Sequence, residues 1–117
     1  MLKVISITLK TAQLEEMQHF YEFLGFQFER VRVDKGSEIL RGKCDNLELS
    51  LMAVAGSTKN LQPILQLHFQ VKSVLKTSEA LRNNTKAQFM LDPMQFEQGL
   101  RCIVMDPDGN SIDLTEK

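Results

Sequence analysis

The sequence passes twice through the same order of hydrophobic patterns. Residues 4–9 alternate between apolar and polar side chains, which is typical of a half-buried strand, and residues 64–71 alternate in the same way. Each of these runs is followed by a helical pattern and then by three further strand-like runs. The similarity between the halves is one of pattern and not of identity. We therefore predict two modules of the order β-α-β-β-β.

The predicted modules occupy residues 1–55 and 63–117 of a single domain, with a linker at residues 56–62. The linker is inferred from its Gly, Ser, Thr and Asn residues, which precede a proline. The strands are predicted at residues 4–9, 26–33, 38–41, 46–53, 64–71, 87–91, 98–105 and 111–115. The helices are predicted after Thr11, with Thr11 as the cap and Gly25 as the stop, and over residues 73–82. Lys35 and Gly36 predict a turn.

Composition narrows the classes of partner and compartment. The chain has 117 residues, of which 43% are hydrophobic, enough for one core. Its 14 Lys and Arg against 15 Asp and Glu give a net charge of −1, which argues against binding to nucleic acid or anionic lipid. No stretch approaches the roughly 18 apolar residues of a membrane span. Two separated cysteines, Cys44 and Cys102, predict buried thiols in a reducing, cytoplasmic setting.

Two motifs at opposite ends of the chain indicate a family. The helix segment HFYEFLGFQF (residues 19–28), the segment DPDGNSIDL (residues 106–114) and the doubled element order together resemble the vicinal oxygen chelate superfamily. This superfamily includes glyoxalase I, extradiol dioxygenases, fosfomycin resistance proteins and bleomycin resistance proteins. The resemblance covers essentially the whole chain. It implies an α+β fold in which two βαβββ modules form a curled mixed sheet around a cavity.

The resemblance also implies a homodimer. Small proteins of this type often build each cavity from two chains. The sequence leaves open whether the chains pack side by side or exchange modules.

The second motif contains an acidic residue within a strand. Asp106 to Gly109 predict a tight turn, after which Ile112 and Leu114 face the core and Asp113 faces the other way. In the metal-dependent members that the chain resembles, this acidic position is a metal ligand on a face that lines the cavity. The alternative is a solvated aspartate on the open face of an edge strand.

A metal site is carried over from the resemblance at four positions: Ser6, Glu48, Gln66 and Asp113. Glu48 and Asp113 are hard oxygen donors, whereas Ser6 and Gln66 stand where these relatives commonly have histidine. Without imidazoles, a 2-His-1-carboxylate iron site is excluded. We expect no cofactor. The alternative is a divalent ion (Mg, Mn, Ni or Zn) held by Glu48, Gln66 and Asp113, with a carboxylate as the catalytic base.

Further polar residues share the face that would line the cavity. His68 lies two residues beyond Gln66, and three interpretations stay open: a hydrogen-bonding residue of the cavity, a ligand or general base, or a solvated histidine. Arg101 either faces the cavity or forms an internal salt bridge. The residues expected to bind ligand are Ser6, Thr8, Ser50, Gln66, His68, Gln70 and Arg101.

These features predict a protein that binds a small polar organic molecule without a complete catalytic metal site, as bleomycin resistance proteins do by sequestration. The second hypothesis is a divalent-metal-dependent enzyme of the glyoxalase or lyase type that uses Glu48 and Asp113 as ligands, or a dioxygenase relative with a degenerate site. The third is a protein-interaction role with a vestigial cavity. The sequence does not disclose the ligand.

Overall fold

The structure is a computed structural model that describes residues 2–32, 38–56 and 65–116. The predicted turn at Lys35 and Gly36 lies outside these ranges, as does the predicted linker 56–62 apart from Gly56. None of the helices in the described ranges has the length and hydropathy needed to cross a membrane.

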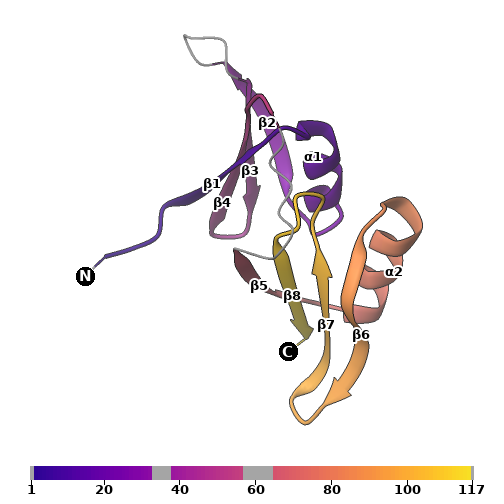
Figure 1. Cartoon of the computed structure of the whole chain (residues 1–117). Helices are drawn as coiled ribbons and strands as arrows, with labels where there is room; N and C mark the ends of the chain where they lie inside the picture. Colours follow the sequence, from indigo (N-terminus) through magenta and orange to yellow (C-terminus); the bar gives the residue numbers. More distant parts are fainter. Residues whose placement is uncertain (1, 33–37, 57–64, 117) are drawn as a thin grey trace. The chain divides into compact units, whose positions relative to one another are not determined.

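The chain divides into two units, Met1–Thr58 and Lys59–Lys117, which share one order of elements (Figure 1). The first unit contains β1 (Ser6–Thr11), α1 (Leu14–Glu22), β2 (Gln27–Arg32), β3 (Glu38–Cys44) and β4 (Leu47–Ala53). The second unit contains β5 (Gln66–Val71), α2 (Val74–Asn84), β6 (Gln88–Phe96), β7 (Gly99–Met105) and β8 (Ser111–Glu116). The predicted α+β class and the doubled βαβββ order are confirmed.

Both sheets have the same mixed topology. Their strand orders are β1-β4-β3-β2 and β5-β8-β7-β6. The first strand of each unit runs parallel to the last, and the remaining neighbours are antiparallel. The last strand of each unit therefore lies inside its sheet, with hydrogen-bonded neighbours on both sides.

The core of the first unit lies between α1 and one face of its sheet. Helix α1 packs on β2 and β4. Its side chains Met17, Phe20 and Tyr21 are buried. The sheet contributes buried Leu9, Leu40, Leu49 and Leu51. Burial of apolar side chains of this size is worth about 1.5–3 kcal/mol each, so this layer is the main stabilising feature of the unit.

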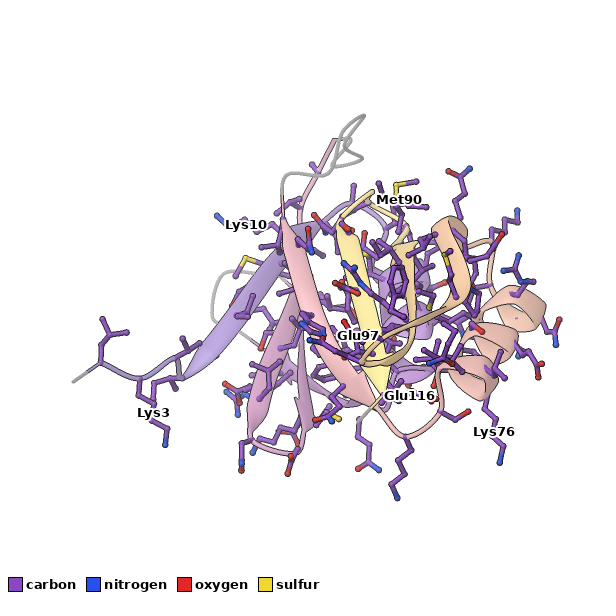
Figure 2. All side chains as sticks on the ribbon, turned by 90° about the horizontal axis from the view of Figure 1, so that it is seen from below. Lys3, Lys10, Lys76, Met90, Glu97 and Glu116 are labelled. Carbon is purple, nitrogen blue, oxygen red and sulfur yellow. The ribbon has the colours of Figure 1, made fainter. Side chains whose placement is uncertain are left out.

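The second unit buries one face of its sheet in the same way. Helix α2 packs on β6, β7 and β8. Its buried Val74 and Leu81 lie on the same side as Cys102, Val104, Ile112 and Leu114, all fully buried. Figure 2 shows Lys76 of α2 pointing away from the sheet, as expected for the solvent side of an amphipathic helix.

Strand β6 is longer than predicted and contains a proline. The predicted strand ended at Leu91, whereas β6 extends to Phe96 through Pro93. Two register shifts interrupt its pairing with β7, between Phe89 and Leu91 and between Leu91 and Met94. Because β6 is an edge strand, Pro93 can occupy a position where no backbone N–H has to be donated to a further strand.

The predicted cap of the first helix was wrong. Thr11 is the last residue of β1, and its Oγ1 accepts a hydrogen bond from the backbone N–H of Gln13 at 3.0 Å. Gln13 itself occupies the cap position of α1 and makes no capping bond with its side chain. The threonine thus stabilises the turn between strand and helix.

Helix α2 is capped by the adjacent Ser73 and by Glu116, which is distant in sequence. Ser73 Oγ accepts a hydrogen bond from the Lys76 N–H at 3.1 Å. The Val74 N–H donates to Glu116 Oε2 at 2.7 Å, and Figure 2 places Glu116 at the end of the last strand, near this helix. A carboxylate at a helix N-terminus satisfies an N–H and meets the positive end of the helix dipole.

Replacement of Glu116 by alanine is expected to lower the free energy of unfolding by about 1 kcal/mol, because the first turn of α2 loses its charged acceptor. Urea denaturation measures the change. Glu97→Ala is the matched control, since Glu97 is exposed in the turn between β6 and β7. Equal effects of the two substitutions would show that the Val74 contact contributes nothing.

Gly42 on β3 lies where no side chain fits. A Cβ placed there would lie 2.7 Å from the backbone oxygen of Leu49 and 2.7 Å from Phe28 Cδ1. We expect Gly42→Ala to destabilise the first unit by about 1–3 kcal/mol, since the aromatic ring or the sheet has to move. Gly56→Ala is the comparison, because its Cβ meets nothing within 4 Å and its cost comes only from the φ of +88°. A smaller loss for Gly42→Ala than for Gly56→Ala in urea denaturation would contradict this packing.

Cys102 is fully buried on β7. Burial, and then the negative charge of Asp113, raise the pKa of its thiol to about 11. Since the thiolate is the reactive form, we expect a thiol reagent at pH 8 to modify half-buried Cys44 first and Cys102 only after unfolding. A Cys44→Ala variant reports Cys102 alone. Rapid labelling of that variant in the native state would refute the prediction.

Candidate functional site

The first unit gathers four of the predicted site residues on the face of its sheet opposite α1. In the parallel pairing of β1 with β4, Ser6 lies across from Glu48 and Thr8 lies across from Ser50. Ser6 and Thr8 are exposed, whereas Ser50 is buried. The face thus offers one carboxylate among hydroxyl groups.

Glu48 has a cationic neighbour that the sequence did not identify. Arg41 on β3 lies across from Ser50, so its side chain shares the face. Its Nε lies 3.4 Å from Glu48 Oε1, and its Nη1 lies 3.8 Å from Glu29 Oε1. These distances, and the exposure of Arg41 and Glu29 beside the half-buried Glu48, indicate a loose ion-pair network. The alternation of residues 38–41 could have placed Arg41 on a face of the sheet. The sequence did not show how this strand pairs with the strand that carries Glu48.

The second unit brings the other predicted residues together on the face opposite α2. Gln66, His68 and Gln70 of β5 are exposed and alternate with half-buried apolar residues. They lie across from Ser111, Asp113 and Thr115 of β8, in that order. The residue directly across from Asp113 is therefore His68, whereas Gln66 lies across from Ser111.

Asp113 is held by a bidentate salt bridge. Arg101 Nε donates to Asp113 Oδ1 at 2.9 Å, and Arg101 Nη2 donates to Oδ2 at 2.8 Å. The aspartate is only 5% exposed, so it is neither a solvated residue nor on an edge strand. The hydrogen bond, and then the negative charge of Asp113, raise the pKa of Arg101. Arg101 was predicted either to face the cavity or to form an internal salt bridge. In the structure it forms the salt bridge, and its side chain lies on the polar face.

His68 and Thr115 complete a group that we call the polar cluster: His68, Arg101, Asp113 and Thr115. His68 Nε2 lies 2.8 Å from Thr115 Oγ1, and the tautomer of the ring decides which atom donates. Thr115 in turn lies across from Arg101 on β7. Thr115 lies two residues beyond Asp113 on β8, but the sequence did not identify it as a site residue, because its partners come from β5 and β7.

The two candidate carboxylates, Glu48 and Asp113, each lie beside a guanidinium group. Among the described residues, no three His, Cys, Asp or Glu side chains come together in a way that could hold an ion. Both oxygens of Asp113 accept hydrogen bonds from Arg101, and Glu48 lies beside Arg41. An ion at either carboxylate would meet the positive charge of a guanidinium and would have to displace it.

One protein-family model matches within the first unit of the chain. Residues 3–53 match the Bd2520-like N-terminal family, which is described as lactoylglutathione lyase-like. A comparison with curated protein sequences gives no match.

Solved structures match both units. A glyoxalase family protein from Bacillus cereus is 17% identical, with a TM-score of 0.81 over 99% of this chain and 94% of the other. The trypanothione-dependent glyoxalase I of Leishmania major is 18% identical, with a TM-score of 0.74 over 99% and 87%. The fosfomycin resistance protein FosX of Mesorhizobium loti is 14% identical, with a TM-score of 0.75 over 98% and 91%. At these identities the likeness concerns the fold. This likeness agrees with the fold that the resemblance of the two sequence motifs implies, and the family match covers residues 3–53.

Proposed function

We propose that the chain binds a small polar organic molecule without a resident metal ion, in the manner of bleomycin resistance proteins. The observation that carries this proposal is the bidentate pair of Arg101 with Asp113. A buried carboxylate needs a compensating partner, and the guanidinium supplies both the charge and the hydrogen bonds. The acidic position that serves as a metal ligand in the metal-dependent relatives is thereby already neutralised.

The other residues of the polar faces suit a polar ligand. Ser6, Thr8, Gln66, His68 and Gln70 are exposed and carry hydroxyl, amide or imidazole groups. Such side chains both donate and accept hydrogen bonds, and they bind polar organic molecules without an ion.

A divalent-metal-dependent enzyme of the glyoxalase type is the second candidate. It is supported by the family match, and by the place of Glu48 and Asp113 on the corresponding central strands β4 and β8. Glu48 keeps one favourable property for this role, since its contact with Arg41 is longer and more exposed than the Asp113 pair. An ion could compete more easily there.

A metal titration separates the two candidates. We expect protein purified without chelator to contain no stoichiometric metal, and its melting temperature not to rise saturably with Mg²⁺, Mn²⁺, Ni²⁺ or Zn²⁺. An ion at 100 times its Kd would add about 2.7 kcal/mol to stability, which a thermal-shift measurement detects.

The matched controls are two double variants. Glu48→Ala with Asp113→Ala removes the candidate ligands, and Glu15→Ala with Glu97→Ala removes two exposed carboxylates elsewhere. A saturable rise in melting temperature for the wild type and the second double variant, absent in the first, would establish the metal-dependent alternative. If the protein carries no metal and also binds nothing from a panel of neutral and charged polar compounds, the small-molecule function itself fails.

A further inference from the structure

The polar cluster contains an arginine that is fixed on one side and available on the other. A guanidinium has five N–H donors, and the pair with Asp113 uses one on Nε and one on Nη2. These two donors define the side edge of the group. The end edge, formed by Nη1 and the second hydrogen of Nη2, points away from the aspartate and has the spacing that binds a carboxylate through two parallel hydrogen bonds.

The pair with Asp113 also prepares Arg101 for binding. An arginine side chain loses considerable rotamer freedom when it binds a ligand, and this loss opposes binding. Here the aspartate, which is 5% exposed and lies on a central strand, already fixes the guanidinium plane. The arginine side chain itself remains 37% exposed, so a ligand can reach it.

Apolar side chains lie beside the guanidinium. Met94 lies across from Arg101 on β6 and is 53% exposed. The Phe96 ring centroid lies 5.7 Å from Arg101 Cζ, and Phe96 is 39% exposed. On the other side, Thr115 lies across from Arg101, and its hydroxyl is bonded to His68. The guanidinium therefore lies between an exposed apolar surface and the hydrogen-bonded pair of Thr115 and His68.

We propose that this arrangement is a subsite for an organic carboxylate whose body is apolar. The end edge of Arg101 binds the carboxylate, Thr115 and His68 offer further polar contacts, and the body of the ligand covers Met94 and Phe96. Asp113 acts as a positioning residue that orients Arg101. The inference rests on the proposed small-molecule function and gives its ligand a chemical class.

The test uses 3-phenylpropionate as the probe and its neutral amide, 3-phenylpropionamide, as the matched compound. Binding is followed by NMR through the Arg101 Nε–Hε resonance, assigned with an Arg101→Lys variant. We expect the acid to shift this resonance saturably and to bind about tenfold or more tightly than the amide, because only the acid forms charge-assisted hydrogen bonds. Both affinities are measured on the wild-type protein, and the variant serves only to assign the resonance.

Two substitutions locate the subsite. Arg101→Lys keeps the positive charge but not the two-donor edge, and we expect it to weaken binding of the acid by about tenfold. Arg82→Gln is the control, because Arg82 also pairs with an aspartate (Asp92, at 2.9 Å) and stacks on a ring (Phe89, 4.2 Å from Cζ to the centroid). It lies on α2 away from the polar cluster, and its replacement should leave the affinity unchanged.

Three outcomes would overturn the subsite. They are equal affinity for acid and amide, unchanged affinity in Arg101→Lys, and loss of affinity in Arg82→Gln. If the panel of polar compounds still contains a ligand of the metal-free protein, the proposed function survives and only its assignment to carboxylates is lost. Stoichiometric metal removes the proposed function instead, whatever the acid and amide show.

Discussion

Each unit depends on the parallel pairing that inserts its last strand between its first and third strands. In the second unit, β8 is bonded to β5 on one side and to β7 on the other. Its alternation then sends Ile112 and Leu114 into the core under α2 and Asp113 to the opposite face. A slip of one residue would exchange these faces, burying the carboxylate among apolar side chains. One pairing therefore fixes both the core and the polar face.

The two units use their acidic central-strand residues differently. Asp113 is buried and joined to Arg101 by two short hydrogen bonds, whereas Glu48 is more exposed and lies 3.4 Å from its arginine. A buried carboxylate cannot rely on water for compensation, so it requires a well-placed cation, while an exposed one does not. The rigid pair in the second unit is consequently the stronger basis for binding another molecule, because its geometry exists before the ligand arrives.

Much of the fold could be predicted from the sequence because strand alternation and turn chemistry are local. Alternation placed Glu48, His68 and Asp113 on faces opposite the helices, as the structure has them. Alternation does not give the register between strands that are distant in sequence. That His68, rather than Gln66, lies across from Asp113 depends on hydrogen bonds between β5 and β8, and the partnership of Arg41 with Glu48 depends on the pairing of β3 with β4.

Local rules also failed where the surroundings overrode them. Thr11 suited the cap of α1, but β1 extends through it and α1 has no side-chain cap. In the second unit, Glu116 at the end of β8 supplies a charged cap for α2. Pro93 lies inside β6 because that strand is at an edge. Predicting these features requires the order of the strands in the sheet, which local sequence does not give.

The irregular edge of the second sheet has a consequence for aggregation. An intact edge strand offers a continuous row of donors and acceptors on which a foreign chain can grow as an additional strand. In β6, Pro93 removes one donor, and the two register shifts twist the backbone away from a flat template. Amyloid-like recruitment along this border is therefore suppressed. Exposed side chains of this strand stay available for contacts, and among them Met90 projects outward (Figure 2).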